Sequence, residues 1–178
     1  MKVESIVNIE VVQKNIQDFF LYIEERITFK DAKGDPCAKS YRVKNYEDKK
    51  SLQKMLDVIR ADSETFTAIT NEIIETSSKI NLMLRDAKDH LDMETRKRML
   101  KMLEGNQFPK NADKELKIML AQKDLENLRR DVFILEKWVL RLEDLKKIVY
   151  NLQKEMKDAR KDILGNIVTG KQIGRAHV

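Results

Sequence analysis

The chain has 178 residues, of which 37% are charged, with five glycines, two prolines and one cysteine. Its 35 basic and 30 acidic residues give a net charge of +5, which excludes a polycation, and no apolar run is long enough to span a bilayer. Cys37 has no partner for an internal disulfide, and Glu4 and Glu10 interrupt the apolar N-terminus, which makes it a poor export signal. We therefore expect a cytoplasmic protein, with a nuclear or cytoskeletal location as the alternatives.

Residues 1–45 are predicted to form a first helix followed by a loop. The helix covers residues 3–29, and a strand over 6–12 is the alternative because β-branched residues are frequent there. Residues 30–45 break the pattern, since 34–36 read as a turn and 41–43 suit a short extended piece. The apolar positions of this first helix recur at threes and fours: Ile9, Val12, Ile16, Phe19, Ile23 and Ile27.

Residues 46–104 are predicted to form a second long helix, 46–90, and a short helix, 92–104. Asp92 is the expected N-cap of the short helix and Gly105 its stop. Asp62 and Thr76 are the two polar positions in the apolar seam of the long helix, and Asp62 marks a candidate kink. That seam contains Leu52, Met55, Ile59, Asp62, Phe66, Ile69, Ile73, Thr76, Ile80, Met83 and Ala87.

Residues 105–112 read as a linker, and residues 113–164 as one long coiled-coil helix that begins near Asn111 or Asp113. All fourteen positions of its seam are apolar, which is typical of a helix that pairs with another helix. The step Val139–Leu142–Leu145 is three and three, which predicts a local stammer. The seam is Ile118, Ala121, Leu125, Leu128, Val132, Leu135, Val139, Leu142, Leu145, Val149, Leu152, Met156, Ala159 and Ile163.

Together these patterns predict an all-α fold: an elongated antiparallel helical hairpin or coiled coil with an additional N-terminal helix. Phe133, Ile134, Trp138 and Ile148 form a second apolar stripe beside the last seam. Packing against the first helix is the preferred interpretation of this stripe, and an exposed partner site is the alternative. The candidate partner-binding residues are Phe133, Trp138, Leu142, Leu145, Val149 and Leu152.

Residues 165–178 are expected to be a flexible tail. Its last six residues, 173–178, match the translation of a common sequencing-adapter read, ATC GGA AGA GCA CAC GTC, which a TGA stop follows directly. The two preceding adapter bases, AG, also complete a CAG codon for Gln172. We interpret 173–178 as an adapter artefact and the chain as a fragment of a longer protein, with an ordinary disordered tail as the alternative.

One stretch resembles an enzyme motif, but the chain as a whole does not predict an enzyme. Residues 165–171 fit the spacing of a phosphate-binding loop, yet Gln172 stands where Ser or Thr would bind Mg²⁺. The stretch also follows a charged helix rather than a buried strand. His90 stands alone, and no His/Cys cluster has metal-binding spacing. We expect no catalytic residue, metal or cofactor.

Basic residues gather in two places, which leaves nucleic acid as a second candidate ligand. Phosphates would be contacted through charge alone, without reading of sequence. Solvated charges near helix ends are the preferred interpretation of both clusters. The candidate contacts are Arg42, Lys44, Lys49, Lys50, Arg96, Lys97 and Arg98.

The predicted function is structural: a scaffold that pairs helices with protein partners, or with itself, in a larger assembly. The first alternative is a nucleic-acid-associated helical protein. The second is a helical regulatory segment of a longer protein whose remaining domain the fragment lacks.

Overall fold

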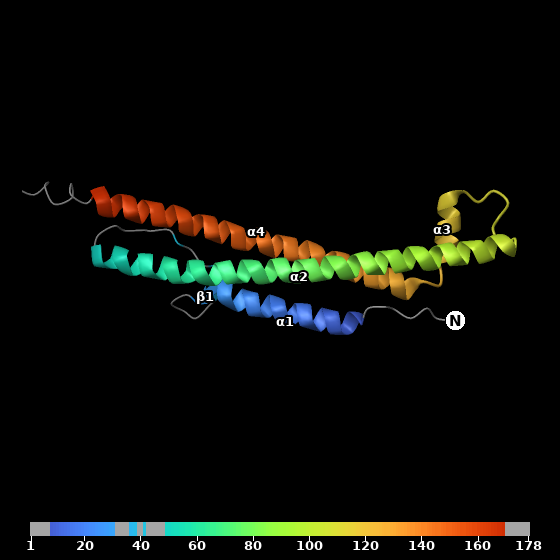
Figure 1. Ribbon diagram of the computed structural model, residues 1–178, viewed down its shortest axis with the longest axis horizontal. Helices are drawn as coiled ribbons and strands as arrows, with labels where there is room; N and C mark the ends of the chain where they lie inside the picture. The colour runs from blue at the N-terminus through green and yellow to red at the C-terminus, as the bar shows by residue number, and fades with distance from the viewer. Residues whose placement is uncertain (1–7, 31–35, 39–40, 42–48, 170–178) are drawn as a thin grey trace, which may run out of the picture. The chain divides into compact units, whose positions relative to one another are not determined.

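In the computed structural model the chain is built mainly of four helices, which confirms the predicted all-α class (Figure 1). The structure describes residues 8–30, 36–38, 41 and 49–169. The helices are α1 (Ile9–Ile27), α2 (Lys49–Glu104), α3 (Lys114–Gln122) and α4 (Glu126–Thr169). The chain divides into two compact units, Met1–Phe19 with Glu75–Leu142 (unit 1) and Phe20–Ile74 with Glu143–Val178 (unit 2).

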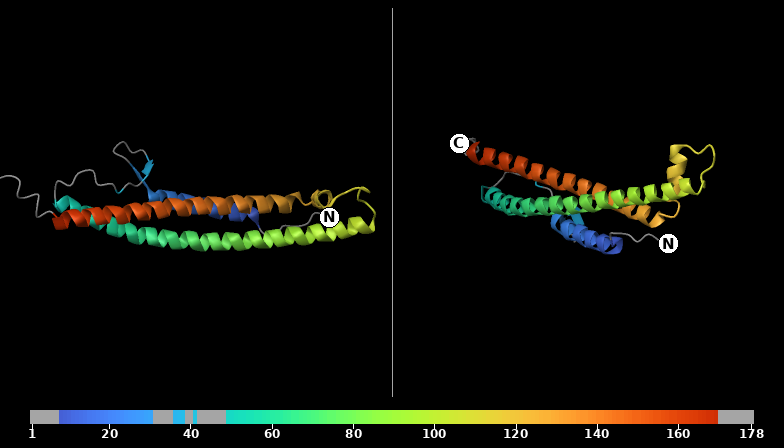
Figure 2. Two further views of the ribbon diagram at one scale, coloured as in Figure 1. Left: turned by 90° about the horizontal axis from the view of Figure 1, so that it is seen from above. Right: turned by 45° about the vertical axis from the view of Figure 1, so that its right-hand side comes forward.

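In unit 1, α2 and α4 run antiparallel, and contacts between their side chains fix the register. The Lys88 ammonium lies 2.9 Å from a Glu136 carboxylate oxygen, and Arg98 lies 2.9 Å from Asp124, just before α4 begins. A higher residue number on α2 is thus paired with a lower residue number at α4, as expected for antiparallel helices. Figures 1 and 2 show the two helices side by side. α3 lies between α2 and α4 in the sequence, and the Asp113 side chain accepts a hydrogen bond from the Leu116 amide as its N-cap.

In unit 2, α2 and α4 also run antiparallel, and a small β-hairpin lies between α1 and α2 in the sequence. Gln153 on α4 donates a 3.1 Å hydrogen bond to the Thr70 hydroxyl on α2. Tyr22 on α1 donates a 3.3 Å bond to Glu72 on α2. Strands β1 (Thr28–Lys30) and β2 (Pro36–Ala38) pair antiparallel in the region predicted as helix end and loop, with Phe29 opposite Cys37.

The α4 core is more regular than the sequence predicts. Its buried positions alternate three and four without interruption, because Asp131 and Trp138 occupy the places assigned to Val132 and Val139. The two valines are only half-buried. The predicted stammer is therefore wrong. The buried positions of α4 are Leu128, Asp131, Leu135, Trp138, Leu142, Leu145, Val149, Leu152, Met156, Ala159 and Ile163.

The second long helix has no break. α2 continues through Asp62, the candidate kink, and through Asp92, where the short helix is predicted to start. All eleven predicted seam positions between Leu52 and Ala87 are buried or half-buried. α2 ends as expected at Gly105, whose amide still donates to Lys101 at 3.0 Å, and Asn106 follows with a φ of 48°.

The last predicted helix differs at both ends. It is divided into α3 and α4, because the chain turns at 123–125, where the Leu125 amide donates to the Gln122 carbonyl at 2.9 Å. At the other end α4 continues to Thr169, so the predicted tail at 165 begins inside the helix. Tyr41 is described but is not part of a strand. The adapter-like residues 173–178 lie outside the described residues.

Candidate functional site

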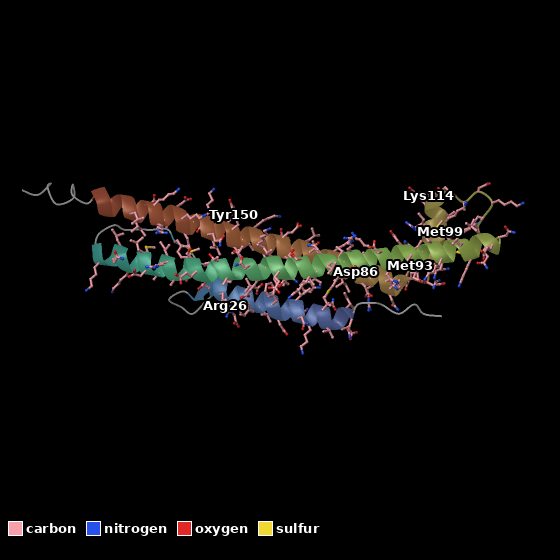
Figure 3. All side chains as sticks on the ribbon, in the orientation of Figure 1. Arg26, Asp86, Met93, Met99, Lys114 and Tyr150 are labelled. Atoms are coloured by element: carbon pink, nitrogen blue, oxygen red, sulfur yellow. The ribbon has the colours of Figure 1, made fainter. Side chains whose placement is uncertain are left out.

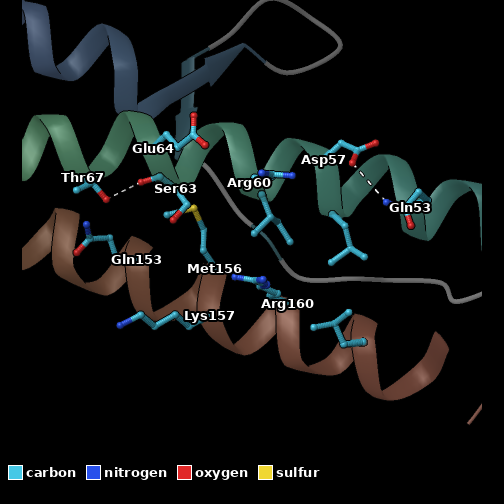
Figure 4. Close-up of a pocket in the computed structure, with 13 residues that line it drawn as sticks. Gln53, Asp57, Arg60, Ser63, Glu64, Thr67, Gln153, Met156, Lys157 and Arg160 are labelled. Atoms are coloured by element: carbon cyan, nitrogen blue, oxygen red, sulfur yellow. Dashed lines mark hydrogen bonds between the residues drawn. The ribbon is translucent and has the colours of Figure 1, made fainter. Parts of the chain in front are cut away.

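A groove runs along one flank of the α2–α4 pair in unit 2. Its larger part is a hollow of about 720 Å³ (Figure 4), and a second hollow of about 450 Å³ shares Gln153 with it. We call the lining residues the groove face. From α2 they are Gln53, Leu56, Asp57, Ile59, Arg60, Ser63, Glu64, Thr67, Thr70 and Ile73. From α4 they are Lys146, Lys147, Val149, Tyr150, Asn151, Gln153, Met156, Lys157, Arg160 and Leu164.

Helical geometry explains why these residues share a flank. One residue step turns a helix by about 100°, so a residue directly after a buried position lies to one side of it. Arg60 follows Ile59 on α2, and Lys157 follows Met156 on α4. In an antiparallel pair these two following sides meet on the same flank, which places Arg60, Arg160 and Lys157 on the walls of one groove (Figure 4).

The other flank of the same pair is already covered by the chain. Glu72 directly precedes the buried Ile73 and receives the Tyr22 hydroxyl from α1. Tyr41 is 3% exposed and donates a 2.7 Å hydrogen bond to Asp62. Burial of the Tyr41 side chain raises the pKa of its phenol far above the usual value, and the bond to Asp62 raises it further. The groove face therefore lies on the flank opposite the Tyr22 and Tyr41 contacts.

The floor of the groove is apolar. Ile59 and Met156 are 3% exposed and belong to the core, whereas Leu164 and Tyr150 are 43% and 66% exposed. Gln153 lines both hollows, and its amide donates hydrogen bonds to the Thr70 hydroxyl and the Phe66 carbonyl. The Thr70 hydroxyl in turn donates to the same carbonyl at 2.8 Å, so this polar spot is internally satisfied.

The walls of the groove carry more positive than negative charge. Five lining residues are cationic and two, Asp57 and Glu64, are acidic. Asp57 accepts a long 3.4 Å bond from Gln53, and Lys147 pairs with Asp144 at 3.0 Å. No carboxylate in the described part of the chain forms an ion pair with the remaining cations, which are Arg60, Lys146, Lys157 and Arg160.

The predicted partner-binding residues are mostly in the core of the chain itself. Trp138 is 6% exposed, and the Arg141 guanidinium carbon lies 5.0 Å from its ring centre. Leu142, Leu145, Val149 and Leu152 are also buried. Phe133 is 55% exposed, with the Lys137 ammonium 4.3 Å from its ring centre. Of the predicted set, the groove face contains Val149 alone.

The predicted basic residues belong to different units. In unit 1, Lys97 pairs with Glu94 at 2.7 Å and Arg98 pairs with Asp124, while Arg96 lines a small hollow of about 340 Å³. In unit 2, Lys49 begins α2, and Lys50 is exposed on it. Arg42 and Lys44 lie outside the described residues. Two of the three cations at 96–98 are therefore already neutralised by acids.

In unit 1, two polar side chains, Asp131 and His90, have buried atoms without hydrogen-bond partners. Asp131 is 2% exposed, and its Oδ2 has no hydrogen-bond partner. The ring nitrogens of His90 are also buried without partners. The Lys88–Glu136 pair and the 3.3 Å bond from Gln122 to Thr95 place His90 at about the level of Asp131. Within the described residues no group of three His, Cys, Asp or Glu residues has metal-binding geometry.

The outer face of α2 in unit 1 also exposes apolar side chains, among them Met93 (Figure 3) and Leu100. Both line the 340 Å³ hollow together with Asp89, Asp92 and Arg96. Charges of both signs surround this hollow, which gives it no preference for the charge of a ligand. The phosphate-loop pattern begins inside a helix, because residues 165–169 belong to α4, while 170 and 171 lie outside the described residues.

The chain gives no significant match to any protein-family model, curated protein or solved structure. None of the helices, over the described residues, combines the length and apolar character needed to cross a membrane. The groove face itself was missed by the sequence analysis. Its signal was present, since Arg60, Lys157 and Arg160 each follow a seam residue, and antiparallel pairing brings such positions together.

Proposed function

We propose that the chain is a coiled-coil scaffold that binds a helix of a protein partner on its groove face, within a larger cytoplasmic assembly. The observation that carries the proposal is the groove itself. It has an apolar floor, it extends over two hollows that share Gln153, and it lies on the flank opposite the Tyr22 and Tyr41 contacts. An amphipathic helix placed there would add a third helix to the pair.

The exposed apolar residues of the groove favour association with a helix. Burial of Leu164, Tyr150 and the neighbouring floor residues would remove apolar surface from water, which drives most helix–helix association. The rim residues would then set the choice of partner and its register. The nucleic-acid alternative has less support, because Lys97 and Arg98 are paired with acids. The regulatory-segment alternative depends on sequence beyond the chain, which a full-length transcript would supply.

A display experiment tests the proposal. A library of three-heptad peptides with leucine at the two seam positions of each heptad is panned against the chain, beside a library of the same compositions in scrambled order. We expect recovery of the heptad peptides alone, and their loss with Tyr150→Glu and Leu164→Glu, which change exposed floor residues. Equal recovery of scrambled peptides, or recovery that these two changes leave intact, would contradict the proposal.

A further inference from the structure

We propose that the helix bound by the groove face is acidic along its flanks; this inference rests on the proposed function and specifies its partner. Five cations and two acids line the groove. Four of these cations have no ion-pair partner in the described part of the chain: Arg60, Lys146, Lys157 and Arg160. Arg60, Lys157 and Arg160 line the larger hollow. These side chains are available to a ligand of negative charge.

The apolar floor identifies the ligand as a helix rather than a nucleic acid. Leu164 and Tyr150 offer exposed apolar atoms in the groove, where a phosphate backbone gains nothing. A helix with leucines on one face and glutamates beside them fits both features, since leucine covers the floor and glutamate meets the cations.

The groove also sets the length of the ligand. Gln53 and Ile73 mark its ends on α2, and a helix rises about 1.5 Å per residue, so the groove is roughly 30 Å long. A partner segment of about 20 residues, close to three heptads, fills it. Glutamates of that segment are expected on the sides of its apolar stripe, where they reach Arg60 from one edge and Arg160 from the other.

The test uses the same library with the flanking positions randomised among Glu, Lys, Gln and Ser. It is panned against the wild-type chain, against the groove variant Arg60→Glu/Lys157→Glu/Arg160→Glu, and against a control, Lys54→Glu/Lys154→Glu/Lys161→Glu. The control residues are exposed on the same two helices and do not line the groove, and the change in charge is equal. Circular dichroism and thermal unfolding establish that each variant is folded. The glutamine version of the groove variant replaces it if charge reversal prevents folding.

We expect Glu to exceed Lys at the flanking positions on the wild type and on the control, and the preference to disappear or reverse on the groove variant. The affinity of a selected acidic peptide should fall about tenfold or more, since three exposed ion pairs are lost and like charges replace them. Heptad peptides recovered without a preference for Glu, or with the same preference on all three proteins, would overturn the inference and leave the proposed function standing.

Failure of the proposed function gives a different result, which is recovery of no heptad peptide above the scrambled library. A labelled 20-nucleotide RNA is measured in parallel. RNA binding that the groove variant loses, in the absence of peptide binding, would identify a phosphate site and would overturn both the acidic-helix inference and the proposed function.

Discussion

The Tyr41 hydroxyl donates a 2.7 Å hydrogen bond to Oδ2 of Asp62, a polar residue in the otherwise mostly apolar seam of α2. A carboxylate at such a position would be costly without a donor. Tyr41 supplies that donor from the segment between β2 and α2, and its ring is buried at 3% exposure. Asp62 thus has a hydrogen-bond donor within the continuous helix α2. The contact also covers the flank of unit 2 opposite the groove face.

Tyr41→Phe is expected to lower the free energy of unfolding by about 1–2 kcal/mol, because a hydrogen bond to a carboxylate is lost while the ring remains. Urea unfolding followed by circular dichroism measures the change. Tyr150→Phe is the matched control, since Tyr150 is 66% exposed, and it should change stability by less than about 0.5 kcal/mol. Equal stability of Tyr41→Phe and the wild type would show that the bond contributes nothing.

The same contact predicts a loss of stability in alkali. Burial and the bond to Asp62 raise the Tyr41 pKa above the unfolded value of 10.0, so the folded state favours the protonated phenol. This contribution is fully present below about pH 10 and is lost as the pH rises further, when the unfolded chain ionises first. Unfolding free energies of wild type and Tyr41→Phe between pH 8 and 11 should therefore converge above about pH 10. A constant difference across that range would contradict the account.

Asp131 provides a test of the α4 register. It is buried in the seam with an unpartnered Oδ2, so Asp131→Leu should raise the free energy of unfolding by about 1–3 kcal/mol. Thermal unfolding measures the change. Asp158→Leu is the control, because Asp158 is exposed on the same helix and should have little effect. If Asp131→Leu destabilises the chain, Asp131 is not an unsatisfied residue of the seam.

Binding of nucleic acid is predicted to be weak. Lys97 and Arg98 already pair with acids, which leaves Arg96 without an acidic partner among the three. At about 150 mM salt we expect a 20-nucleotide RNA to bind with a Kd no stronger than about 0.1 mM, the weak end of non-specific binding. Fluorescence anisotropy measures it. Micromolar binding that Arg96→Ala weakens would restore the nucleic-acid alternative.

The sequence predicts the helical class and most of the core, because its apolar periodicity is strong. It misplaces the α4 seam between Leu128 and Leu142, since a purely apolar criterion selects Val132 and Val139 over Asp131 and Trp138. Counting back in threes and fours from Leu142 reaches Trp138, Leu135 and Asp131 without a stammer. The regularity of the repeat was a better guide there than the polarity of a single residue.

The division between α3 and α4 was not predictable in the same way, because 123–125 contains neither glycine nor proline. Contacts within unit 1 hold the residues on either side of it: Asp124 pairs with Arg98, and Gln122 donates a hydrogen bond to Thr95. The groove face escaped prediction for a related reason. Its cations lie far apart in the sequence and resemble other charged residues there. The antiparallel pairing of α2 and α4 brings Arg60 and Arg160 to one groove.

Hydroxyl-radical footprinting with the selected acidic peptide tests the central claim most directly. Tyr150 and Leu164 are exposed on the groove face, whereas Tyr22 and Phe133 are exposed elsewhere. We predict that saturating peptide protects Tyr150 and Leu164 from oxidation and leaves Tyr22 and Phe133 unchanged. Protection of Phe133 with unchanged oxidation of Tyr150 and Leu164 would contradict the claim that the groove face binds the helix.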